Sequence, residues 1–548
     1  MKAGWKKVID TFLSGQGENP LIATKMTAGA RFYFDLSTSV RWSGSVVGIV
    51  RVERELARRA RAHLGDRVAF CVYDKAKARF LRIPDTIVDD VIHDELRVSF
   101  DPRPKYEDVS ISRAVRQYAP FWREELSYQL LLRPKLYRLL QKARLRSLSE
   151  EDIFRVRCER EAALAGGHPW GASRSQMRRK IAKSQGFYKF LHELRGRSLS
   201  EDEIDALRET IFSPPSPYPD GGLWAEDVFV DDIELDERSI VISGGLDWEH
   251  KNIRQIYALK KEKGFKYYSV IYDLIPRLFP HFVVPGYDTL LRDYLGELTW
   301  LVDMGLCISE TTRADFLAYT EEMNAPTPKL AVFPLGADLP LKVTNGSRGR
   351  GALPQELRGR RFGLYVSTIE PRKNHRTIYE AWDLCVRSKM VDPTRHCLVF
   401  VGMRGWGVDD LIREIEMNPA TKKSIILLGR VPDETLAAVY RASAFNIFPS
   451  HYEGYGLPLA EAMREGKAVF ASNCGSLAEI GGDLVVRYDP KNVVEWAQGL
   501  ARAMNDEEYV DGLAQRVKSL FRPTTWDAAA EIFFESVTRS AADENSRP

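Results

Sequence analysis

Residues 444–461 combine a short apolar segment, a glycine-rich turn and the start of a helix. The apolar segment, 444–448, predicts a buried strand, and Pro458 falls in the first turn of the helix, where proline is favoured. This order indicates a turn at the carboxyl end of a strand. We therefore predict an open α/β sheet, which binds ligands at that edge.

Two carboxylates flank this turn, Glu453 in the loop and Glu461 on the helix, eight positions apart. The glycines between them allow the backbone to approach a ligand closely, and free N–H groups at a helix start bind phosphate. A phosphate site would then lie between two carboxylates, each free to accept hydrogen bonds from hydroxyl groups. A nucleotide sugar has this arrangement of groups. Two solvated glutamates in an ordinary connection would have the same spacing, so the neighbouring motifs must decide.

The segment resembles the E-x7-E motif of retaining glycosyltransferases, in particular glycosyltransferase family 4. That resemblance implies the GT-B fold, in which two Rossmann-like α/β domains face each other across a cleft. It also implies that Glu453 contacts the transferred sugar and that Glu461 binds the ribose hydroxyls. The residues expected to contact the diphosphate through their backbone are Gly454, Tyr455, Gly456 and Leu457.

Residues 362–375 resemble the first strand and turn of the donor-binding domain in the same family. Lys373 is similar to the family lysine that neutralises the departing diphosphate. Many members carry an arginine where this chain has Ser367 or Thr368, so Arg372 is the candidate for the second positive charge. Two later residues match the position where family members hold the base: Arg430 and Val431.

The N-terminal half resembles the family at two places. A small-residue loop at 43–48 leads into a helix, and the resemblance places Gly48 and Arg51 over the donor phosphates, although a plain tight turn fits the loop equally well. Another strand ends in Tyr272 and Asp273, where the family commonly has His-Asp. A role that needs an imidazole cannot be transferred to Tyr272, whereas Asp273 is expected to act on the acceptor side.

The motifs divide the 548 residues into domains, and the composition, 44% hydrophobic and 28% charged, suits two or three soluble domains. The predicted parts are an N-terminal acceptor-side domain (1–340) with a helical insertion (about 100–235), a flexible linker (341–361), a C-terminal nucleotide-sugar-binding domain (362–523), a helix crossing back to the first domain (524–540) and a disordered tail (541–548).

The chain has no apolar run near the roughly 20 residues that span a bilayer, and its first residues do not resemble a secretory signal. The six cysteines are scattered, as in reduced cytosolic proteins. A net charge of +3 over the whole chain does not favour a nucleic-acid partner. We therefore expect a cytoplasmic protein.

Within the insertion, residues 113–146 interleave aromatic and basic side chains. Such helices lie on anionic membrane surfaces in some proteins. A helix that packs on its own domain with a solvated basic face has the same pattern, and both interpretations stay open. The first would make the protein peripheral on the inner face of the membrane.

The family resemblance implies a retaining glycosyltransferase that works without a metal ion or cofactor. Its expected catalytic residues are Lys373, Glu453 and Asp273. The expected partners are a nucleotide-diphosphate sugar and a glycan or lipid-linked glycan acceptor of surface polysaccharide synthesis. GDP-mannose is the preferred donor, because 370–375 and 452–458 resemble polysaccharide mannosyltransferases.

Two other classes of protein share the GT-B fold. A nucleotide-sugar epimerase would release nucleotide and altered sugar without an acceptor. A non-catalytic binding protein would keep the fold but should have lost the charged residues of the site. The joint presence of Lys373, Glu453 and Glu461 favours an enzyme over a binding protein.

Overall fold

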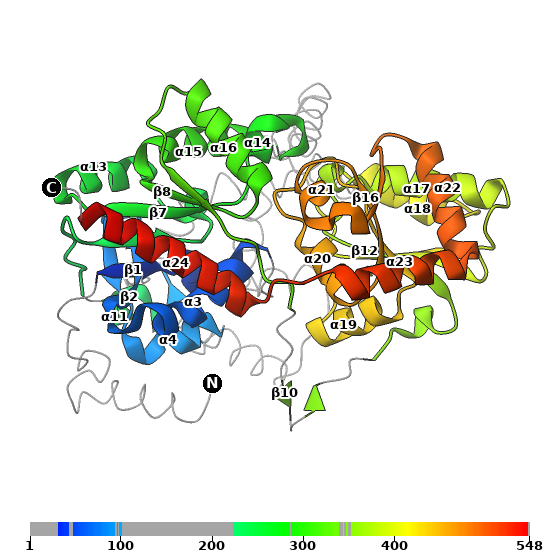
Figure 1. Cartoon of the computed structure of the whole chain (residues 1–548), viewed down its shortest axis with the longest axis horizontal. Helices are drawn as coiled ribbons and strands as arrows, with labels where there is room; N and C mark the ends of the chain where they lie inside the picture. Colours follow the sequence, from blue (N-terminus) through cyan, green and yellow to red (C-terminus); the bar gives the residue numbers. More distant parts are fainter. Residues whose placement is uncertain are drawn as a thin grey trace, which may run out of the picture. The chain divides into compact units, whose positions relative to one another are not determined.

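The computed structural model describes residues 31–42, 48–93, 96, 98–100, 223–229, 231–284, 286–338, 343–344, 347–348 and 352–545. The described residues of 31–99 and 225–545 form one compact unit, which contains two large sheets (Figure 1). The predicted helical insertion falls mostly outside the described residues. The basic and aromatic stretch 113–146 falls wholly outside them.

The N-terminal sheet has seven strands, and only β3 at its edge pairs antiparallel with its neighbour. Strands such as β6 and β8 are buried along their length, as expected where helices cover both faces of a parallel sheet. In spatial order the strands are β3 (Arg79–Arg82), β2 (Val68–Asp74), β1 (Phe32–Asp35), β6 (Ile240–Ser243), β7 (Lys266–Ile271), β8 (Met304–Cys307) and β9 (Lys329–Val332).

Helices connect these strands in the βα order of a Rossmann-like domain. Helix α3 follows Gly48, which has a φ of +53°. Because α3 lies in the connection between the parallel strands β1 and β2, its N-terminus faces the carboxyl edge of the sheet. The helices are α2 (Ser37–Arg41), α3 (Ile49–Leu64), α4 (Asp85–Ile92), α11 (Ala225–Val228), α12 (Asp247–His250), α13 (Ile253–Lys263), α14 (Ile275–Leu278), α15 (Tyr287–Leu301) and α16 (Glu310–Glu322), with 3-10 turns at Gly65–Arg67 and Pro280–Phe282.

The C-terminal sheet has six parallel strands. In spatial order they are β14 (Ile425–Gly429), β13 (His396–Val401), β12 (Arg361–Val366), β15 (Phe445–Phe448), β16 (Ala468–Ser472) and β17 (Val486–Tyr488). The chain winds in one direction from β12 to β14 and in the other from β15 to β17. The turns after the adjacent strands β12 and β15 therefore lie side by side, at the switch point where such sheets bind ligands.

Helices cover both faces of this second sheet. They are α17 (His375–Arg387), α18 (Asp409–Met417), α19 (Asp433–Ala442), α20 (Leu457–Arg464), α21 (Ser476–Gly481), α22 (Val493–Asn505) and α23 (Glu507–Leu520), with 3-10 turns at Gln355–Leu357, Pro371–Lys373 and Gly482–Leu484.

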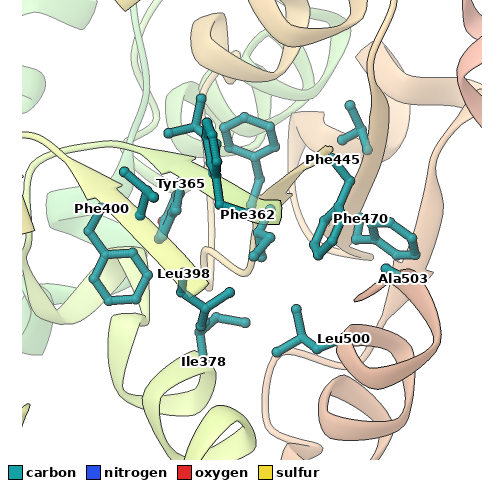
Figure 2. Packing of buried hydrophobic residues seen from close by; sticks show 14 of the residues in the cluster. Phe362, Tyr365, Ile378, Leu398, Phe400, Phe445, Phe470, Leu500 and Ala503 are labelled. Atoms are coloured by element: carbon teal, nitrogen blue, oxygen red, sulfur yellow. The ribbon is translucent and has the colours of Figure 1, made fainter. Parts of the chain in front are cut away.

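A continuous apolar core holds this sheet to its helices (Figure 2). Phe445 and Phe470 come from neighbouring strands, and their rings meet edge to face with centroids 5.3 Å apart. Ile378 of α17 and Leu500 of α22 pack in the same cluster. Replacing one of the buried rings with alanine would cost about 3–5 kcal/mol, so the core gives the turns above it a rigid base.

The last helix, α24 (Trp526–Asn545), packs against α3 of the N-terminal domain, and Figure 1 draws it in red. It continues through 541–545, which we had expected in a disordered tail. The reason lies in tertiary contacts: Ala541 is 2% exposed, and its carbonyl accepts a hydrogen bond of 2.8 Å from Arg31. These contacts fix a segment that local sequence leaves unspecified.

The linker predicted as flexible includes a short antiparallel pair, β10 (Val343–Thr344) with β11 (Ser347–Arg348). The predicted α/β class with two Rossmann-like domains, the GT-B organisation, is confirmed by the two sheets. None of the helices in the described part of the chain combines the length and the hydropathy of a membrane-spanning segment.

Candidate functional site

A cavity of about 440 Å³ lies at the carboxyl ends of strands from both sheets. Its walls come from the turns after β12 and β15, the starts of α3 and α20, and the end of β7. The cavity is lined by every site residue predicted from the sequence: Gly48, Arg51, Asp273, Ser367, Arg372, Lys373, Arg430, Val431, Glu453, Gly454, Tyr455, Gly456, Leu457 and Glu461. Their individual roles stay predictions.

Two cations hold the carboxylate of Glu453. Lys373 Nζ lies 2.6 Å from its Oε1, and an Nη atom of Arg372 lies 2.8 Å from its Oε2. Burial raises the pKa of this carboxyl, but the charges of Lys373 and Arg372 outweigh burial and bring the pKa to about 2. Glu453 is therefore ionised at neutral pH, with two positive charges beside it inside the cavity.

The backbone places both cations. Pro371–Lys373 forms a single 3-10 turn, and the Tyr365 hydroxyl donates a 2.6 Å hydrogen bond to the Lys373 carbonyl. The Arg372 carbonyl accepts a 2.9 Å hydrogen bond from the backbone N–H of His451, in the turn after β15. The two turns of the switch point are thus bonded to each other.

The loop after Glu453 requires glycine at two positions. A Cβ on Gly454 would fall on the carbonyl oxygen of Tyr272 and lie 2.9 Å from Cβ of Asp273. Gly456 has a φ of +88° immediately before α20, a conformation that L side chains rarely adopt. The loop therefore packs directly on the end of β7, and α20 directs its N-terminus at the cavity.

Glu461 is paired across the two domains. Its Oε1 lies 2.7 Å from an Nη atom of Arg51, and its Oε2 accepts a 3.1 Å hydrogen bond from the Tyr440 hydroxyl. Burial raises the pKa of the Glu461 carboxyl, and Arg51 and Tyr440 offset part of that rise. A ligand hydroxyl that bonds this carboxylate would compete with Arg51 or share its position.

Asp273 follows β7 and faces the cavity from the N-terminal domain. Its Oδ1 accepts a 3.1 Å hydrogen bond from the backbone N–H of Ile275. Burial raises the pKa of Asp273, and the charge of Arg372 opposes that rise. The neighbouring Tyr272 points its hydroxyl to the Gly244 carbonyl, so its phenol is occupied in the fold.

Sequence reasoning missed two acids of the site. Glu370 lines the cavity and pairs with Arg372, with 2.9 Å between the charged atoms. Asp433, at the start of α19, lines the same cavity. Both could have been found from their position: Glu370 precedes the two cations in one turn, and Asp433 follows shortly after Val431.

The cavity combines the groups that a diphosphate ester of a sugar requires. Lys373 and Arg372 supply positive charge, the N-termini of α3 and α20 supply free N–H groups, and carboxylates line the walls for hydroxyl groups. Among the described residues, no group of three or more His, Cys, Asp or Glu side chains is arranged to hold a metal ion.

Residues 354–519 match the family model described as Glycosyl transferases group 1. The O-antigen chain mannosyltransferase B of Escherichia coli is 34% identical over 166 residues, 30% of this chain and 42% of that protein. The serotype-specific mannosyltransferase WbdA of E. coli is 26% identical over 297 residues, 52% of this chain and 35% of that protein. The aligned regions thus span less than half of each relative.

Among solved structures, Anabaena HepE in complex with UDP and glucose aligns with a TM-score of 0.44 and 14% identity, over 55% of this chain and 79% of that chain. So weak a likeness says nothing of this chain's substrate. The family match covers the turns that carry Lys373, Glu453 and Glu461. Residues 354–519 are therefore similar to the glycosyl transferases group 1 family, and the chain is similar over part of its length to the two E. coli mannosyltransferases.

Proposed function

We propose that the chain is a retaining, metal-independent glycosyltransferase. It moves a hexose, preferably mannose from GDP-mannose, to a glycan or lipid-linked glycan in surface polysaccharide synthesis. The names of the E. coli relatives, both mannosyltransferases, support the choice of sugar. The observation that carries the proposal is Glu453 held between Lys373 and Arg372 in a cavity that also contains Glu461.

The donor lies across this cavity with its ribose at Glu461 and its sugar at Glu453. The diphosphate sits between them, at the N-terminus of α20 and beside Lys373. When the donor binds, the side chains of Lys373 and Arg372 contact the phosphates as well as Glu453. Because negative charge grows on the phosphate as the bond to the sugar breaks, these cations stabilise the transition state more than the bound donor.

Retention follows from attack on the face that the phosphate leaves. The bond between the anomeric carbon and the phosphate oxygen breaks, and the acceptor oxygen bonds to that carbon on the same face. The acceptor proton passes to the departing phosphate oxygen. Asp273 orients the acceptor, and no side chain acts as a covalent nucleophile. An acceptor attached to a membrane lipid would suit a peripheral enzyme.

A nucleotide panel tests the proposal. GDP, UDP, dTDP and ADP are added separately, and the unfolding midpoint is measured, since a ligand at 100 times its Kd stabilises by about 2.7 kcal/mol. We expect GDP to give the largest shift. The matching nucleotide sugar is then supplied with methyl α-mannoside, with and without EDTA.

We expect a disaccharide of retained configuration in both samples, read by NMR of the anomeric proton. Altered free sugar formed without acceptor would identify an epimerase. Binding without any turnover, despite acceptors of several kinds, would identify a binding protein. Activity that is lost with EDTA and restored by Mg²⁺ or Mn²⁺ would contradict the metal-free scheme.

A further inference from the structure

Glu479, on α21 of the C-terminal domain, caps a helix of the N-terminal domain. Its Oε1 accepts a 2.8 Å hydrogen bond from the backbone N–H of Glu310. Its Oε2 accepts bonds from the backbone N–H and hydroxyl of Thr311, at 3.0 and 2.8 Å. Within its own domain, the Ser309 side chain caps the first turn of α16 by accepting a hydrogen bond from the Thr312 N–H. One domain thus supplies half of the other's helix cap.

The same short helix holds the loop that carries Glu453. The backbone N–H and hydroxyl of Ser476, the first residue of α21, donate to the Glu453 carbonyl at 3.2 and 3.0 Å. Gly475, just before it, leaves no room for a Cβ, which would lie 2.8 Å from that carbonyl oxygen. Helix α21 is therefore packed on the backbone of Glu453 at one end and bonded to α16 by Glu479.

The start of α16 binds the same loop from the opposite side. Ser309 and Thr312 each donate a hydroxyl hydrogen bond to the Gly454 carbonyl, at 2.7 and 3.2 Å. Tyr452 donates a 2.6 Å hydrogen bond to Asp315, further along α16. The loop is thus enclosed between α16 and α21, and Glu479 joins those two helices directly.

We propose that Glu479 is a positioning residue for glycosyl transfer: by capping α16 it docks the sugar-binding loop onto the domain that presents Asp273. This role rests on the proposed function. Glu479 is not among the residues that line the cavity, so it acts through α16 and α21. Docking of this loop would place the donor sugar, which the loop holds, next to the acceptor.

The exposure of Glu479 suits a contact that forms and breaks. The carboxylate and Glu310 are both exposed, so water can replace their hydrogen bond when the domains separate. A carboxylate at a helix N-terminus gains modestly from the helix dipole. A buried ion pair in the same place would be costly to open. The contact can therefore favour the arrangement in which Glu479 caps α16, and still break when product is released.

The test compares Glu479→Gln with Glu414→Gln, a matched control. Glu414 is an exposed carboxylate of the same domain that pairs with Arg376, also of that domain, at 3.0 Å. Hydrogen exchange of the Glu310 and Thr311 amides, the Kd of GDP, and kcat and KM with GDP-mannose and methyl α-mannoside are measured. Glu479→Asp, which keeps the charge, tests for rescue and stands in if Glu479→Gln does not fold.

In Glu479→Gln we expect faster exchange at Glu310 and Thr311, GDP affinity within about twofold of wild type, and kcat/KM about tenfold lower, equivalent to about 1.4 kcal/mol. Glu479→Asp should recover part of the rate. Exchange and kcat/KM equal to those of Glu414→Gln would overturn the role of Glu479. A Glu479→Gln variant that loses GDP affinity and thermal stability together with turnover would also overturn this role, because Glu479 would then support the fold as a whole. A wild type that bound no nucleotide and transferred no sugar would instead contradict the proposed function itself.

Discussion

At the residue scale, Glu453 and Glu461 have different surroundings in one cavity. Glu453 has a depressed pKa because two cations contact it, whereas burial raises the pKa of Glu461 despite its pairing with Arg51. Under the proposed function, Glu453 contacts the transferred sugar and Glu461 accepts hydrogen bonds from the ribose hydroxyl groups.

Replacing each glutamate with glutamine should separate these tasks. Glu461→Gln should weaken GDP binding by about 1.5–3 kcal/mol, as expected for a hydrogen bond to a charged group. Glu453→Gln should leave GDP binding nearly unchanged while turnover falls. Calorimetry with GDP measures both, with Glu508→Gln, an exposed residue of α23, as control. Equal GDP affinity in all three variants would show that Glu461 does not bind the ribose.

Lys373 should act on the rate of reaction more than on binding. Lys373→Ala should lower kcat by about 10²–10³-fold, comparable to the loss of one oxyanion donor, because the charge it meets develops as the phosphate leaves. Steady-state kinetics measures this effect, and Lys422→Ala, an exposed lysine outside the cavity, serves as control. A variant with normal kcat and only a higher KM would show that Lys373 merely binds the donor.

Glu53 on α3 should make stability depend on pH. Burial, then the charge of Asp35, raises its pKa from 4.5 to about 8, and its Oε2 accepts a 2.7 Å hydrogen bond from the Ser39 N–H. Between these two values the folded protein holds a proton that the unfolded chain releases. Stability therefore falls as pH rises through this window.

Glu53→Gln cannot ionise and should remove that part of the dependence. Urea unfolding at pH 5 and pH 8 measures it. The loss of stability between the two pH values should be smaller in Glu53→Gln than in wild type, because all other titrating groups are shared. An equal loss in both proteins would mean that Glu53 does not carry a shifted pKa.

At the scale of elements, the strand, turn and helix around Glu453 were predictable because their signals are local. The apolar run became β15, and the proline and glycines fixed the start of α20. The pairing of Arg51 with Glu461 could not be predicted, because it joins residues 410 positions apart through the packing of two domains. The end of α24 was missed for a similar reason, since its last turn depends on Arg31.

Gly454 tests whether the turn after β15 must contact β7. In Gly454→Ala the new Cβ would collide with the Tyr272 carbonyl, so the loop must move away from Asp273. We expect the fold to be retained and kcat/KM to fall at least about tenfold. Such a fall corresponds to a loss of about 1.4 kcal/mol of transition-state stabilisation. Circular dichroism checks the fold.

The matched control is Gly512→Ala, in α23. A Cβ on Gly512 would have no heavy atom within 4 Å, so alanine should leave activity unchanged and stabilise the helix by about 0.5–1 kcal/mol. Full activity of Gly454→Ala would show that close approach of the turn to β7 is not needed for transfer.

At the scale of the whole molecule, each domain supplies part of one site. The C-terminal domain contributes Lys373 and Glu453, and the N-terminal domain contributes Arg51 and Asp273. The two-domain organisation was predictable because each half carries its own series of strands ending in turns. The individual contacts between the domains, such as that of Glu479 with α16, depend on tertiary packing, so the local sequence does not predict them.

The role of Glu453 is tested most directly by sugar transfer from GDP-mannose to methyl α-mannoside, measured by mass spectrometry for wild type and Glu453→Gln, with GDP affinity measured in parallel. We expect a disaccharide from wild type and little or none from Glu453→Gln, with similar GDP affinity in both. Transfer by Glu453→Gln at the wild-type rate would show that the reaction does not depend on the carboxylate between Lys373 and Arg372.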